Sequence, residues 1–185
     1  MATRDEESRG WLGTFSRFSV WVGGGVLVCT AVLVTVDILM RKLLGQGLRG
    51  TDELSGYALA VVTVWALPYA LLERANIRID LLYPKRHPRL AAVLNLFALA
   101  SLAGFAAILV VFCGKVFLDS FANGSLSATT LKMPLMYPQS LWVTGLVVWL
   151  AVLLVQLGRT LLAVWRGDLQ RVGQIAGMDT PDDIL

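Results

Sequence analysis

Residues 90–118 read LAAVLNLFALASLAGFAAILVVFCGKVFL, and Lys115 is the only charged residue among these 29. A helix crosses the roughly 30 Å hydrocarbon core of a bilayer with about 20 apolar residues. The run exceeds that length, which leaves room for a tilted helix or for a polar turn that emerges at one end. It therefore predicts a transmembrane helix.

Three more runs of this kind occur in the chain, with charges only at or near their ends. The four predicted spans hold over half of the 185 residues and are 18–40, 54–73, 90–118 and 136–163. The segments between them are too short for a soluble domain. We therefore expect an all-α integral membrane protein with four transmembrane helices, in which 1–185 form one membrane domain and 164–185 a polar cytoplasmic tail.

The composition argues against other classes of protein. Apolar residues make up 56% of the chain and charged residues 16%, whereas an ordinary soluble domain has about 45–50% and about 25%. Disorder would need more charge and fewer large apolar groups. The net charge is +3 and the basic residues form no contiguous patch, so we expect no nucleic acid partner.

The sequence also lacks the residue patterns of common catalytic and cofactor sites. It contains no Gly-rich phosphate loop that ends in Lys-Ser or Lys-Thr. His87 is the only histidine and lies outside the spans, which leaves no pair of axial ligands for haem. No catalytic set of carboxylate, serine or cysteine residues falls within the spans. We therefore expect neither an enzyme nor a cofactor or metal.

Lys and Arg residues predict the orientation in the membrane because they resist translocation. With four spans, the two termini and the connection 74–89 share one side of the membrane. That side holds eleven Lys and Arg residues, against five on the other side. We therefore expect both termini to be cytoplasmic, although Arg41 and Lys42 alone would favour the reverse orientation.

Asp37 is the clearest ionisable group within a predicted span, and it precedes Arg41 by four residues. This spacing places opposite charges on one face of a helix, and Lys115 precedes Asp119 in the same way. A carboxylate in the membrane indicates either an ion pair that offsets its charge or a site for ion coupling. Because both pairs lie at span ends, interfacial ion pairs are the favoured interpretation.

Acidic residues also begin the second span, where Asp52 and Glu53 suit the positive end of a helix. Before it, residues 38–44 mix apolar side chains with two cations. Such a mixture allows the first helix to continue along the outer surface of the membrane as an interfacial amphipathic segment.

A second amphipathic segment follows the second span. Charged and apolar residues alternate over residues 73–82, which include Glu73, Arg74, Arg78 and Asp80. The segment could lie on the membrane interface, dock against another subunit or form a solvated loop. The residues alone do not separate these alternatives.

Four short motifs, in their order along four spans, resemble a known family. They are Asp37-x3-Arg41, Gly50-Thr51-Asp52-Glu53-Leu54 with Tyr57, the segment 73–82, and Met133-Pro134-x3-Pro138-Gln139. The family that they resemble is the small (Q-type) membrane subunit of the tripartite ATP-independent periplasmic (TRAP) transporters. Asn76 departs from its pattern, since the family commonly has histidine at this place.

The resemblance implies a multi-pass protein of the bacterial inner membrane. It implies two protein partners, a larger TRAP membrane subunit and a periplasmic substrate-binding protein, besides membrane lipid. Such a transporter imports organic acids on an ion gradient, usually of sodium. The chain itself would be a small, non-catalytic subunit that supports the larger one.

The candidate site residues are charged groups near span ends, with structural or partner-contact roles: Asp37, Arg41, Lys42, Arg49, Asp52, Glu53, Glu73, Arg74, Arg78 and Asp80. Among them, the outer cations Arg41, Lys42 and Arg49 either help to dock the binding protein or are solvated. Two other functions stay open at this point. The chain could be a membrane anchor or assembly subunit of another complex, or a small exporter that works as an oligomer.

Overall fold

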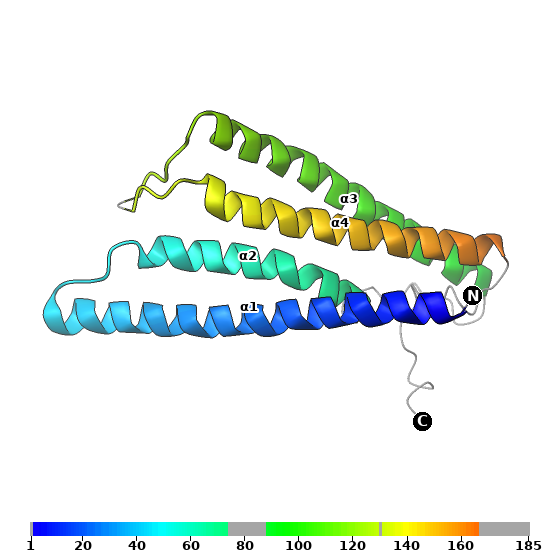
Figure 1. The fold of residues 1–185 in the computed structure, drawn as a ribbon, viewed down its shortest axis with the longest axis horizontal. Helices are drawn as coiled ribbons and strands as arrows, with labels where there is room; N and C mark the ends of the chain where they lie inside the picture. Colours follow the sequence, from blue (N-terminus) through cyan, green and yellow to red (C-terminus); the bar gives the residue numbers. More distant parts are fainter. Residues whose placement is uncertain (1, 74–87, 130, 167–185) are drawn as a thin grey trace, which may run out of the picture.

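The computed structural model describes residues 2–73, 88–129 and 131–166. Four helices make up most of this part of the chain (Figure 1): α1 (Ala2–Leu44), α2 (Thr51–Leu72), α3 (Pro88–Ala122) and α4 (Met136–Trp165). Each is long and apolar enough to cross a membrane. A helix satisfies its own backbone polar groups, which lipid cannot do. The predicted all-α membrane fold is confirmed.

The apolar parts of the helices begin and end within four residues of the expected limits. They run over Phe18–Leu44, Thr51–Leu72, Ala92–Ala122 and Met136–Trp165. Two of the helices begin earlier than their apolar parts, since α1 starts at Ala2 and α3 at Pro88. Proline suits the first turn of a helix, where its missing N–H leaves no hydrogen bond unmade.

Residues 38–44 continue α1 without a break to Leu44. Figure 1 shows this end of α1 in line with the rest of the helix and beyond the starts of α2 and α4. The expected continuation along the outer surface is thus a straight extension of the span rather than a separate helix. The other amphipathic segment, 73–82, lies outside the described residues from position 74 onward.

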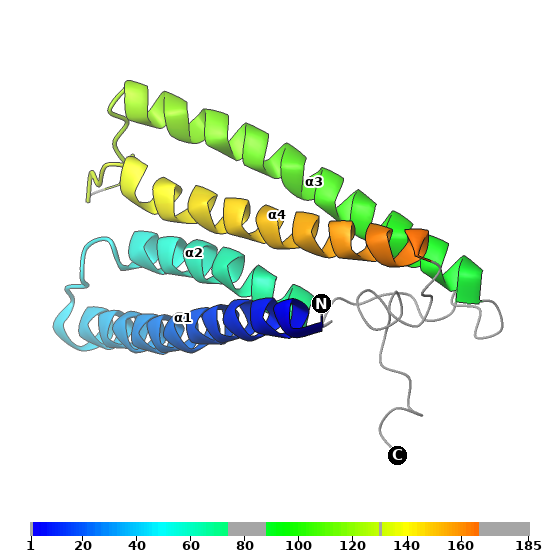
Figure 2. The same ribbon diagram turned by 45° about the vertical axis from the view of Figure 1, so that its right-hand side comes forward.

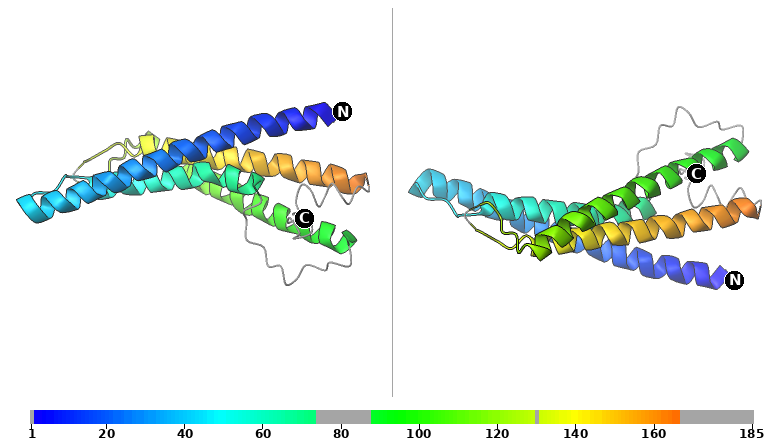
Figure 3. Two further views of the ribbon diagram at one scale, coloured as in Figure 1. Left: turned by 90° about the horizontal axis from the view of Figure 1, so that it is seen from below. Right: turned by 90° about the horizontal axis from the view of Figure 1, so that it is seen from above.

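The four helices form an open row in the order α1, α2, α4, α3 (Figures 1 and 2). Antiparallel hairpins pair α1 with α2 and α3 with α4, and the hairpins meet where α2 packs on α4. Within the described residues, α1 contacts neither α3 nor α4. Figure 3 shows α1 and α3 diverging at the edges of the row. The row therefore leaves long apolar helix faces uncovered.

The core lies along α4, which packs between α2 and α3. Leu153 is fully buried there, beside Leu146 and Trp149 of the same helix, and Val64 and Leu99 join them from the neighbouring helices. Helix α1 contributes no residue to this cluster. Burial of these side chains on three helices stabilises the junction of the two hairpins.

Small residues bring α2 close to its neighbours. A Cβ on Gly145 of α4 would lie 2.8 Å from Cγ1 of Val64, and one on Gly23 of α1 would lie 2.8 Å from Cγ1 of Val62. The Trp65 indole N–H donates to the Leu141 carbonyl at 3.0 Å. This bond and the two glycine contacts fix α2 between α1 and α4, because small residues allow close helix packing in membranes.

Candidate functional site

Asp37 is almost fully buried at the end of the membrane-length part of α1, with 2% of its surface exposed. Its Oδ2 accepts a hydrogen bond from Arg41 Nη2 at 2.7 Å, and its Oδ1 accepts one from the Leu48 backbone N–H at 2.5 Å. The ion pair expected from the four-residue spacing is therefore present. The bond to Leu48 additionally holds the connection between α1 and α2 against the helix.

Gly47 makes this return of the chain possible. A Cβ at position 47 would lie 2.7 Å from Asp37 Oδ1 and 2.9 Å from Arg41 Nε. Any side chain there would displace the charged groups that bind the connection. The glycine therefore allows the backbone to approach the carboxylate closely.

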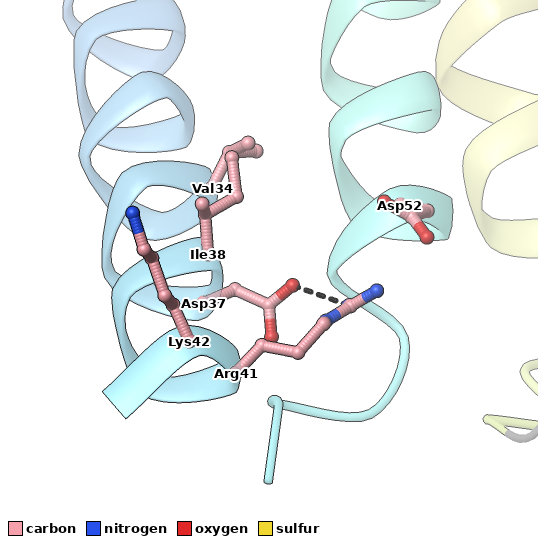
Figure 4. Close-up of a pocket in the computed structure, with 6 residues that line it drawn as sticks. All are labelled: Val34, Asp37, Ile38, Arg41, Lys42 and Asp52. Atoms are coloured by element: carbon pink, nitrogen blue, oxygen red, sulfur yellow. Dashed lines mark hydrogen bonds and ion pairs between the residues drawn. The ribbon is translucent and has the colours of Figure 1, made fainter. Parts of the chain in front are cut away.

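A small open pocket of about 340 Å³ lies beside Asp37, between the end of α1 and the start of α2. Figure 4 shows Arg41 directed from α1 toward α2, with Asp52 on the facing helix. Lys42 also lines the pocket, so it holds two acidic and two basic side chains. Because Arg41 already balances the charge of Asp37 and Lys42 adds a second positive charge to the pocket, this arrangement suits an ion pair better than a cation site.

Glu53 joins the two hairpins at the same end of the molecule. One of its oxygens accepts a hydrogen bond from the Tyr57 hydroxyl at 2.5 Å, and the other accepts from the Thr129 hydroxyl. Thr129 belongs to the connection between α3 and α4 and is also bonded to Ser127, with 2.9 Å between the hydroxyl oxygens. The carboxylate thus links the first turn of α2 to the other connection.

Gly50 adds an apolar contact between the same connections. Its φ is +87°, a left-handed conformation that glycine adopts without strain. A Cβ at this position would overlap Cδ1 of Leu131. The backbone conformation therefore favours glycine here, and a side chain would in addition displace Leu131.

The remaining predicted site residues are spread over both ends of the described bundle. Arg49 is exposed in the connection between α1 and α2, and Glu73 is exposed at the end of α2. Glu73 therefore does not join the group around Asp37. Arg74, Arg78 and Asp80 lie outside the described residues.

The prediction of a second ion pair, between Lys115 and Asp119, was wrong. No ion pair joins Lys115 to Asp119 in the described part of the chain, and both residues are exposed. Lys115 Nζ instead lies 5.6 Å from the ring centroid of Phe112, one turn earlier. An exposed pair contributes little, and a cation that precedes its acid on a helix is the weaker order. Asp37 and Arg41 have the stronger order and bury the carboxylate.

The contacts that sequence reasoning missed join distant parts of the chain. Ser127 and Thr129 showed no pattern that indicated a role, yet they lie at the link to Glu53. Within the described residues, no group of three or more His, Cys, Asp or Glu side chains could hold a metal ion. The polar groups that the structure does describe bind other elements of the protein, since Asp37 accepts from Leu48 and Glu53 accepts from Thr129.

A known protein family matches most of the sequence. The family model described as "Tripartite ATP-independent periplasmic transporters, DctQ component" matches residues 30–163. Neither a curated protein nor a solved structure matches the chain at a significant level. The match covers well over half of the chain. It includes Asp37, Glu53, the connection between α1 and α2, and the connection between α3 and α4. Together with the four membrane-length helices, it shows that this chain is a multi-pass membrane protein of the DctQ family, the small membrane component of TRAP transporters.

Proposed function

We propose that the chain supports a larger TRAP membrane subunit during the import of organic acids on an ion gradient. The open row of helices is the observation that carries this proposal. In the most apolar window of α1 only 11% of the residues are buried within the chain. Large apolar side chains are exposed along all four helices. Such faces suit contact with lipid and with another membrane subunit.

A periplasmic binding protein would deliver the substrate to this assembly. The end of α1 extends beyond the starts of α2 and α4 (Figure 1) and carries Arg41 and Lys42. Exposed cations at a protruding end can steer an acidic surface into place. We infer that this end contacts the binding protein.

The proposed orientation in the inner membrane places both termini in the cytoplasm, because eleven of the sixteen Lys and Arg residues lie on their side. Reporter fusions after residues 47 and 125 should then show periplasmic activity, and fusions after residues 85 and 185 cytoplasmic activity. Each fusion should be checked for equal expression. The opposite pattern at all four sites would overturn the orientation.

A tagged copy of the chain should co-purify with the larger membrane subunit from cells that produce both. We expect a complex of fixed composition on size-exclusion chromatography, with the larger subunit identified by mass spectrometry. A tagged, unrelated four-helix membrane protein is the control. Recovery of the chain as an oligomer of itself, or within a redox complex, would contradict the proposal.

A further inference from the structure

An apolar groove of about 530 Å³ runs along α2 between α1 and α4. Its floor includes Ala58 and Val61 of α2, while Val22 of α1 and Leu141 of α4 form parts of its walls. The groove exists because α1 and α4 both pack on α2 but do not contact each other. It faces outward from the row along a membrane-length helix, so lipid or another apolar chain must fill it.

The groove covers only part of the membrane thickness. Its lining on α2 extends from Leu54 to Trp65, which is about 16 Å at 1.5 Å per residue. This is roughly half of the 30 Å hydrocarbon core and matches one leaflet. A transmembrane helix of a partner would have to continue across the whole core. The length of the groove therefore favours an acyl chain over a helix.

Two tyrosines line one end of the groove, the outer end, and a cation is the sequence neighbour of a third lining residue there. Tyr57 and Tyr137 line it there, and tyrosine is enriched at the level of lipid headgroups. Met133 lines it too and follows Lys132, an exposed residue of the connection between α3 and α4. The tyrosines and this neighbouring cation mark the outer end as the interface with the headgroups.

A second cation, Arg49, belongs to the connection between α1 and α2. Arg49 precedes Gly50 and Lys132 follows Leu131, and Gly50 packs against Leu131. Both side chains are exposed, and neither makes a hydrogen bond or ion pair with another described residue. The nearby carboxylate of Glu53 is already engaged by Tyr57 and Thr129. The two cations are thus available to an external anion.

We propose that the groove binds one phospholipid of the leaflet that the two connections face. One acyl chain lies along α2 between α1 and α4, and the phosphate lies between Arg49 and Lys132. The apolar walls and the two unpaired cations match the two parts of this ligand. The lipid would fill the gap between α1 and the rest of the row.

Photo-crosslinking in nanodiscs of phosphatidylethanolamine tests this site in the full chain with its co-purified partners. The probes are a phosphatidylethanolamine with a diazirine on one acyl chain and a diacylglycerol with the same diazirine but no phosphate. We expect the phospholipid to label residues of the groove about tenfold more strongly than the diacylglycerol does. Arg49→Gln with Lys132→Gln should abolish this preference.

A matched pair of α2 variants tests occupancy. Ala58→Trp fills the groove and should lower groove labelling about tenfold, whereas Ala60→Trp, at an exposed position outside the groove, should leave it unchanged.

Equal labelling of the groove and of the exposed α2 face around Ala60 would show ordinary annular lipid and overturn the site. Loss of the larger subunit on Ala58→Trp, with no groove labelling in the parent chain, would assign the groove to a protein helix instead. If Ala58→Trp fails to accumulate, an unchanged probe preference in the Arg49 and Lys132 variant would still refute the proposal.

Discussion

Replacement of Asp37 by alanine should cause the largest loss of stability among single changes at the end of the bundle where α1 joins α2 and α3 joins α4. The carboxylate accepts hydrogen bonds from Arg41 and from the Leu48 backbone and is almost fully buried. Loss of both charge-assisted bonds should cost about 2–3 kcal/mol. We place the value below that of a fully buried pair, because the Arg41 side chain is 60% exposed. The measurement is the yield of folded protein and its thermal unfolding in detergent.

A double substitution tests whether Asp37 stabilises the protein through its ion pair with Arg41 or by itself. Asp37→Asn with Arg41→Gln removes both charges and keeps side chains of similar shape, so it should recover much of the folded yield. Asp52→Ala is the matched control, since Asp52 lines the same pocket but is exposed. Its effect should be small, because its main contribution is the favourable charge at the start of α2.

An ion-coupling role for Asp37 would give a different result in uptake assays. Neutralising a coupling carboxylate should leave assembly normal and abolish the dependence of uptake on sodium or protons, whatever residue stands at position 41. Normal yield with lost ion dependence in both the single and the double variant would contradict the structural role. Reduced yield of Asp37→Ala, with ion dependence retained in the double variant, is the result we expect.

The sequence predicted those features of the fold that depend on local pattern. Runs of apolar residues located the four helices, because only a helix satisfies its backbone within lipid. The spacing of Asp37 and Arg41 likewise predicted their ion pair, since residues four apart share a helix face. The same rule failed for Lys115 and Asp119. Both side chains are exposed, and the Lys115 ammonium group lies over the ring of Phe112, one turn earlier in the helix.

Contacts between distant segments could not be read from these patterns. Glu53 and Thr129 are 76 residues apart and meet only because the two hairpins pack through α2 and α4. The role of Gly50 depends on its contact with Leu131 in the other connection. The order of the helices in the row could not be predicted either. Each span has apolar residues on several faces, so hydropathy does not indicate which helices pack against each other.

Transport should require the larger subunit and the binding protein as well as this chain. The family match identifies the chain as one component of a tripartite system, and its own helices form an open row rather than an enclosed path. Proteoliposomes that contain the chain alone should therefore show no uptake above that of empty vesicles. Proteoliposomes with both membrane subunits should take up the substrate when the loaded binding protein and an inward ion gradient are added.

The most direct measurement is uptake of radiolabelled substrate by these vesicles, with each component left out in turn. We expect uptake only with all three proteins and the gradient, and loss of uptake when this chain is omitted although the larger subunit is still inserted. Gradient-driven uptake by the purified chain without the larger subunit, or undiminished uptake without the chain, would contradict its role as a supporting subunit.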